Sequence, residues 1–158
     1  MKTIELTQGL HAIVDDDDFE ALSRHKWTAQ FNKRRTVVYA IREARDGRVY
    51  MHRLLAGARK SDIVDHENRN GLDNRRSNLR LVSRGQNKLN SRLPKNNKSG
   101  FRGVTLDRKK RKWRAFIGYG GALHYLGSFE DVEGAAKAYD DAARLHHGEF
   151  ANLNLGVL

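Results

Sequence analysis

The sequence predicts an α+β fold built from short antiparallel strands and a few helices. Two β-rich runs, residues 37–41 and 48–51, flank a turn that contains Asp46-Gly47, which is typical of a hairpin. Nearer the C-terminus, three strand-like runs at 101–104, 112–119 and 123–126 are punctuated by glycines. Alanines and aromatics then recur every three or four residues from Val132 to His146, which indicates a helix. A three-stranded antiparallel sheet packed on one helix is therefore expected there.

Residues 1–50 are expected to form a β-rich extension with one small helix. The four consecutive aspartates at 15–18 have two interpretations. They could hold a metal, but Phe19, Leu22 and Trp27 follow them in a pattern that suits a short helix. An aspartate at the N-cap and acidic charge in the first turn both stabilise a helix, so the capping interpretation is favoured.

Composition indicates a polyanionic partner. The 158 residues suffice for one ordinary domain or two small ones, and 30 Lys and Arg against 19 Asp and Glu give a net charge of +11. Nucleic acid is the first candidate for such a chain. No basic amphipathic helix, lipidation signal, signal-peptide core or apolar run of about 20 residues is apparent, so no membrane partner is expected. The chain has no cysteine, which fits a reducing cytoplasm and excludes a thiolate zinc site.

The most informative motif places a carboxylate beside an imidazole, in Asp65-His66, with asparagines 13 and 22 residues after Asp65, at Asn78 and Asn87. Hydrolysis of a phosphodiester requires a metal that neutralises developing charge and a base that activates water. Carboxylate and amide oxygens suit Mg²⁺ or Mn²⁺, and a neutral histidine is the natural base near pH 7. The polar segment 67–71 supplies the bend that would bring Asp65 and His66 to one site.

Residues 51–90 resemble the HNH nucleases of phages and intron-encoded homing endonucleases, which have a ββα-metal active site. The resemblance implies that His66 is the general base and that Asp65 and Asn87 bind one divalent metal ion, most often Mg²⁺, with Mn²⁺ as the alternative. It also implies that Asn78 ties the loop to the helix and orients His66. A lone Asp-His pair is usually a turn, and asparagine-rich segments are usually loops. The match at all four positions favours the nuclease.

His52 opens a predicted helix at 52–56, in a His-Arg-Leu triplet that recurs in similar nucleases. It is either an active-site neighbour or a packed structural histidine. Residues 91–100 contain the only proline and no acid, as expected of a basic linker. The resulting domain scheme is a β-rich extension at 1–50, an HNH module at 51–91, a linker at 92–98 and a further domain at 99–158.

Charge in that further domain is split between its two halves. Residues 100–129 carry seven basic side chains against Asp107, whereas 130–149 carry six acids against two basic side chains. The sheet, rather than the helix, is therefore expected to face DNA. Neutralising Glu133 or Asp140 on the acidic helix is expected to reduce DNA affinity only slightly.

Residues 99–154 resemble the Apetala/ethylene-response-factor DNA-binding domain through Arg-Gly-Val, Lys-Trp-Arg-Ala, Leu-Gly-Ser-Phe and Ala-Tyr-Asp elements. The resemblance implies a sheet laid in the major groove of duplex DNA. Thr105 and Gly118 stand at positions that are arginine in plant members, so the plant base preference does not transfer. Trp113 is expected to pack rather than touch DNA. The expected DNA-binding residues are Arg102, Arg108, Lys109, Arg111, Lys112, Arg114 and Tyr125.

The favoured function is a metal-dependent DNA endonuclease that nicks or cuts both strands, in a bacterial or phage-infected host cytoplasm. A single-metal monomer cuts one strand, so double-strand cleavage needs a homodimer or a second event. No obligate protein partner is inferred. The alternative is a DNA-binding regulatory protein with an inactive nuclease-like module. An RNA-binding protein would carry stacking aromatics on a sheet, and the aromatic content of 8% with no evident cluster disfavours it.

Overall fold

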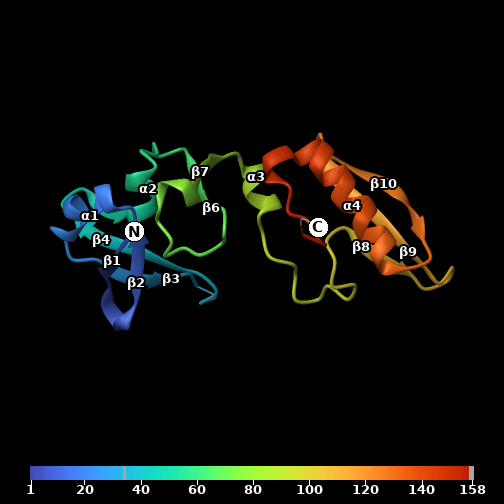
Figure 1. The fold of residues 1–158 in the computed structure, drawn as a ribbon, viewed down its shortest axis with the longest axis horizontal. Helices are drawn as coiled ribbons and strands as arrows, with labels where there is room; N and C mark the ends of the chain where they lie inside the picture. Colours follow the sequence, from blue (N-terminus) through green and yellow to red (C-terminus); the bar gives the residue numbers. More distant parts are fainter. Residues whose placement is uncertain (34, 157–158) are drawn as a thin grey trace. The chain divides into compact units, whose positions relative to one another are not determined.

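The computed structural model describes residues 1–33 and 35–156, and the chain folds into two compact units, Met1–Asn87 and Lys88–Leu158 (Figure 1). Both units mix strands with few helices, as the α+β prediction requires. Within the described residues, no helix is long and apolar enough to cross a membrane.

The first unit contains three small antiparallel sheets. Strands β1 and β2 pair as a hairpin, β3, β4 and β5 form a sheet in that order, and β6 pairs with β7. The predicted hairpin is confirmed as β4 and β5, but Met51 begins a helix instead of ending the strand. The elements are β1 Lys2–Glu5, η1 Thr7–Gly9, β2 His11–Val14, α1 Asp16–Ser23, β3 Thr28–Phe31, β4 Val38–Ala44, β5 Gly47–Tyr50, α2 Met51–Leu55, β6 Ile63–His66, η2 Arg76–Asn78, β7 Leu79–Val82 and α3 Arg84–Leu89.

One hydrophobic core joins the N-terminal strands to the segment that carries the motif. Trp27, Met51 and Leu72 are buried in the same cluster, although they come from three distant parts of the unit. Backbone bonds reinforce this contact: Ile13 N donates to Leu72 O at 2.8 Å, and Asn74 N donates to Ile13 O at 2.8 Å. The N-terminal strands therefore fix the loop that precedes Asn78.

The aspartate run begins a helix, as predicted, but its side chains do not cap that helix. Asp15 occupies the N-cap position of α1, yet its carboxylate accepts a bond from Arg76 N at 2.8 Å. The Asp18 carboxylate accepts two bonds from the Arg76 guanidinium, from Nη2 at 2.7 Å and from Nε at 2.9 Å. These contacts tie α1 to η2, the short turn that ends at Asn78.

The second unit is a three-stranded antiparallel sheet with one helix across a face (Figure 1). It contains β8 Val104–Asp107, β9 Lys112–Tyr119, β10 Ala122–Phe129, α4 Val132–His147 and η3 Gly148–Phe150, with sheet order β10-β9-β8. Ala135, Ala136 and Ala143 are fully buried, so α4 lies close on the sheet. The predicted three strands and helix are confirmed.

The first strand of this sheet begins at Val104, so its predicted span of 101–104 is wrong. Gly103 has a φ of +71°, a left-handed conformation that breaks the strand. A Cβ at this position would lie 2.3 Å from Phe116 O and 2.3 Å from Tyr139 Cδ2. The segment before Val104 therefore turns beneath the helix, where only glycine fits.

Asp140 of α4 is only 1% exposed, so it is part of the interior of the unit, and the small effect of its neutralisation on DNA affinity stays a prediction. Its two carboxylate oxygens accept bonds from Asn154 N at 2.7 Å and Leu155 N at 2.9 Å. The Asn154 side chain in turn bonds the backbone N and O of Arg102, at 2.6 and 3.0 Å. Asp140 thus anchors the C-terminal segment.

Asp140→Ala is expected to destabilise the second unit by about 3 kcal/mol, because it removes two charge-assisted bonds and leaves a cavity where the buried carboxylate lay. Asp140→Asn should cost less, since an amide oxygen still accepts one bond. Urea unfolding followed by circular dichroism measures both, with the exposed Glu133→Gln as the control. An unchanged midpoint in Asp140→Ala would contradict the anchoring role.

Candidate active site

The Asp65-His66 pair ends β6, and both side chains are buried, at 9% and 6% exposure. β6 pairs antiparallel with β7, with His66 opposite Leu79, and α3 follows. The chain turns directly after His66, where Arg69 N donates to His66 O at 2.9 Å. The turn predicted after the pair is therefore present, and its effect on bringing the two side chains to one site stays a prediction.

Asn78 is the buried residue that closes the loop between β6 and β7. Its Oδ1 accepts a bond from Asn68 N at 3.0 Å, and its Nδ2 donates to Asp73 O at 2.7 Å. Its backbone oxygen accepts from Glu67 N at 3.0 Å. These bonds hold both ends of the loop, and the predicted effect of Asn78 on the orientation of His66 stays a prediction.

Burial is the main influence on the protonation of His66. It lowers the pKa of His66 below its ordinary value, and this outweighs the opposing influence of Asn74 hydrogen bonding and of the Asp65 and Asp73 charges. Asn74 is itself fully buried. The imidazole is therefore neutral at pH 7, which is the state that a proton acceptor requires.

His52 lies on α2 beside His66, with ring centroids 5.0 Å apart. It is 7% exposed and packs against Tyr39 at 5.1 Å and Tyr50 at 5.6 Å. Burial, then repulsion from His66 and Arg53, lowers the pKa of His52 to about 3. Within the part of the chain that the structure describes, its Nδ1 has no hydrogen-bond partner. His52 is thus both a packed histidine and a neighbour of His66.

Asp65 and Asn87, the expected metal ligands, have contrasting surroundings. The Asp65 Oδ2 accepts two bonds from the Arg80 guanidinium, at 2.9 and 3.1 Å, across the β6–β7 pair. Asn87 lies exposed on α3, where its backbone N donates to Ser83 O. Their carboxylate and amide oxygens fit the chemistry of a hard divalent cation. Among residues 1–33 and 35–156, no three His, Cys, Asp or Glu side chains converge into a metal-binding group.

The open face of the second unit carries an aromatic and cationic cluster formed by Arg114, Phe116 and Tyr125. The Phe116 and Tyr125 centroids are 5.3 Å apart, and the Arg114 guanidinium lies 5.3 and 6.0 Å from these rings. The expectation that no aromatic cluster lies on a sheet is therefore wrong. The sequence did not predict this pair, because Phe116 and Tyr125 are nine positions apart and meet only through the register between β9 and β10. Trp113 instead packs against the core beneath α4, as predicted.

The predicted DNA-contacting cations divide into exposed and paired groups. Arg108, Lys109 and Arg111 are exposed in the β8–β9 turn. Lys112 pairs with Glu130 at 2.7 Å, and Arg114 pairs with Asp107 at 3.3 Å. The Arg102 Nη2 donates to Ser91 O at 2.6 Å, so this side chain also holds the preceding segment.

Two residues of the first site, Arg80 and Tyr39, were absent from the sequence prediction. Arg80 lies opposite Asp65 in the β6–β7 register, so pairing the two predicted strands would have found it. Tyr39 reaches within 6.0 Å of the His66 ring from β4. Nothing local in the sequence connects these two rings, because only the tertiary fold brings them together.

The chain is similar in sequence to several known proteins. An uncharacterized HNH endonuclease of Acanthamoeba polyphaga mimivirus is 31% identical over 153 residues, which cover 93% of this chain and 76% of that protein. Protein 3.8 of Escherichia phage T7 is 33% identical over 92 residues, 58% of this chain and 75% of that protein. APETALA2-like protein 2 of Oryza sativa subsp. japonica is 37% identical over 70 residues, 44% of this chain and 16% of that protein. No family model and no solved structure matches.

The structure thus has a strand pair with Asp65-His66 at the end of β6, followed by the short helix α3. The similarity to the mimivirus protein spans nearly the whole chain. The chain therefore belongs to the HNH endonuclease family.

Proposed function

We propose that this protein is a divalent-metal-dependent DNA endonuclease whose first unit cleaves and whose second unit binds duplex DNA. The observation that supports it most is the buried pair Asp65 and His66 at the end of β6, with the histidine held neutral. A carboxylate and an uncharged imidazole at one place are the two protein groups that metal-assisted phosphodiester hydrolysis requires.

In this proposal the neutral His66 ring accepts a proton from the water that attacks the phosphate. Asp65 and Asn87 would hold Mg²⁺ or Mn²⁺, and the bound ion supplies positive charge that stabilises the phosphate during hydrolysis. Asn78 keeps the β6–β7 loop in place through Asn68 and Asp73. Arg80 holds the Asp65 carboxylate in position from the neighbouring strand.

DNA binding is assigned to the open sheet face of the second unit and its basic turn. Arg114 and Tyr125 lie on that face, and Arg108, Lys109 and Arg111 extend from the turn between its strands. Cations around an exposed sheet provide phosphate contacts while the sheet approaches base edges. One such site per chain would nick, so cleavage of both strands needs two copies or two events.

Two alternative functions lead to different results in simple assays. A DNA-binding regulator with an inactive nuclease-like module is disfavoured because the residues at all four motif positions are present. A single-strand-binding protein is favoured by one observation, the Phe116 and Tyr125 rings on an open sheet. Duplex and single-stranded DNA must therefore both be tested as binding partners.

The test of the proposed function is incubation of the purified chain with supercoiled plasmid and Mg²⁺, with and without EDTA. Conversion to nicked or linear DNA only when Mg²⁺ is free supports the proposal. Intact plasmid with Mg²⁺ and with Mn²⁺, in a preparation that binds duplex DNA, would leave the regulator as the better description.

Asp65→Asn is expected to weaken Mg²⁺ binding at least tenfold and to slow cleavage in parallel, because it removes the anionic ligand while keeping the shape of the side chain. Asn87→Ala should have a smaller effect, since water can replace a neutral amide oxygen. Isothermal titration calorimetry measures the Mg²⁺ affinity of both variants and a plasmid assay measures their cleavage, with the exposed Asp46→Asn as the control. Unchanged metal affinity in Asp65→Asn would remove this residue from the metal site.

Arg114→Gln is expected to weaken binding to duplex DNA and to reduce the slope of log affinity against log salt by about 0.9, the value for one lost phosphate contact. Glu133→Gln, on the exposed face of α4, should leave both quantities unchanged. Fluorescence anisotropy with a duplex and with its single strand, without metal, measures them. Tighter binding of the single strand would favour the stacking alternative.

A further inference from the structure

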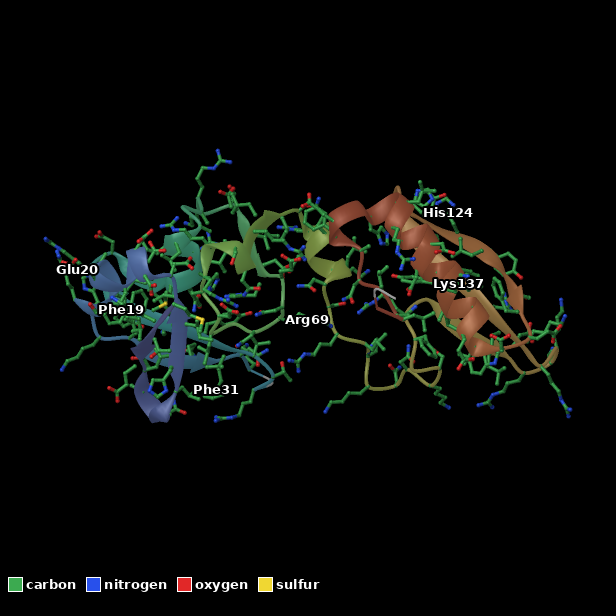
Figure 2. All side chains as sticks on the ribbon, viewed as in Figure 1. Phe19, Glu20, Phe31, Arg69, His124 and Lys137 are labelled. Carbon is green, nitrogen blue, oxygen red and sulfur yellow. The ribbon has the colours of Figure 1, made fainter. Side chains whose placement is uncertain are left out.

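The loop and hairpin that carry the candidate site contain one arginine without a carboxylate partner. Arg75 pairs with Asp73 at 2.6 Å, Arg76 with an aspartate of α1 at 2.7 Å, and Arg80 with Asp65 at 2.9 Å. Arg69, three residues after His66, forms no ion pair within the described part of the chain. Its side chain is exposed, in the loop that follows β6 (Figure 2). An arginine without an ion pair in the described part of the chain therefore lies three residues after the candidate base.

The backbone holds Arg69 in one place. Its N–H donates to His66 O at 2.9 Å, so the turn that carries it is bonded to the strand end itself. Asn68 fixes the next turn of the loop, because its Oδ1 accepts from Asn70 N at 2.9 Å and its Nδ2 donates to Asp73 at 2.7 Å. These contacts join the Arg69 backbone rigidly to the residues of the site.

The conformation of Arg69 is one that arginine rarely adopts. Its φ is +61°, in the left-handed region where glycine is favoured and most side chains are strained. Such a residue persists where the surrounding structure imposes the conformation, and these positions cluster at functional sites. Glycine would adopt this backbone conformation at least as readily as arginine. The stability of the loop therefore does not explain why an arginine is present at this position.

We propose that Arg69 is a substrate-binding residue of the nuclease site, whose guanidinium contacts a phosphate of the DNA strand presented to His66. This proposal rests on the proposed endonuclease function. A guanidinium forms paired, charge-assisted hydrogen bonds with phosphate oxygens. It is available for that contact when no carboxylate is paired with it. Because Arg69 is bonded through its backbone to His66, the contact would set the position of the strand relative to the base.

The experiment compares Arg69→Gly, Arg69→Lys and Arg45→Gln in the full chain. Glycine removes the charge and also relieves the left-handed strain, so the thermal midpoint of this variant should equal or exceed that of the wild type. Arg45 is an exposed arginine of the β4–β5 turn and controls for the loss of one positive charge. The readouts are kcat and KM for cleavage of a duplex, and salt-dependent duplex binding in EDTA.

Arg69→Gly is expected to raise KM about tenfold with kcat within about twofold, and to reduce the salt slope by about 0.9, as for one lost phosphate contact. Arg69→Lys should recover most of the affinity, and Arg45→Gln should match the wild type. Wild-type KM and slope in Arg69→Gly would overturn the proposal, as would equal losses in Arg69→Gly and Arg45→Gln. If the wild type does not cleave, the proposed function fails, whereas the binding slope in EDTA still decides whether Arg69 contacts a phosphate.

Discussion

His66→Ala is expected to lower the rate of plasmid cleavage by about 10²–10⁴-fold while DNA affinity stays within about twofold of the wild type. Loss of a general base removes the activation of water, and its typical cost lies in that range. DNA affinity should persist because a buried, neutral imidazole makes little contribution to phosphate binding. Rates measured by agarose gel at saturating Mg²⁺, with binding measured by anisotropy in EDTA, separate the two effects.

The matched control for this prediction is His11→Ala, which removes an exposed histidine of β2 in the same unit. Its cleavage rate should equal that of the wild type. His66→Asn provides a second comparison, since it keeps a polar side chain but cannot act as a base near pH 7. Nicking by either His66 variant at the wild-type rate would exclude His66 as the base, even if the protein is a nuclease.

Much of the fold could be predicted from local patterns. The Asp-Gly turn specified the β4–β5 hairpin, and the alanine spacing specified α4, because both signals lie within a few residues of one another. Two strands and a short helix surround Asp65-His66, in the order β6, β7 and α3, whereas the metal-binding role of this segment stays a prediction. The first strand of the second sheet was displaced by three residues, because the need for glycine at position 103 arises from contacts with Phe116 and Tyr139.

The surroundings of the site were harder to predict, because they depend on long-range contacts. The sequence suggested His52 as a neighbour of His66, but nothing local placed Tyr39 beside both rings. The charge count along α4 could not show that the fold buries Asp140 to bind the C-terminal segment. Charge counts along the sequence therefore overstate the surface charge wherever a side chain is used internally.

The first unit is expected to lose stability in mild acid, and His52 is expected to cause much of the loss. The pKa of His52 is about 3 in the folded chain, against about 6.5 for an unfolded histidine. Between these pH values the unfolded state binds one more proton than the folded state. The contribution of neutral His52 to the free energy of unfolding is therefore fully present above about pH 6.5, and it falls by about 1.4 kcal/mol per pH unit as the pH decreases toward 3. The lowered pKa of His66 acts in the same direction.

His52→Phe keeps an aromatic ring between Tyr39 and His66 but cannot be protonated, so it should remove the share of the acid sensitivity that His52 causes. Urea unfolding at pH 7.0 and 4.5 measures the free energy of unfolding with and without this substitution. Both proteins also carry Trp113→Phe, so that the fluorescence of the buried Trp27 reports on the first unit alone. The loss of stability between these pH values should be about 2–3 kcal/mol smaller in His52→Phe. The comparison is made within each variant, so a packing defect that is independent of pH cancels. An equal loss of unfolding free energy with and without His52→Phe would mean that His52 still accepts a proton in the folded state. The desolvated surroundings assigned to the His52–His66 pair would then be wrong.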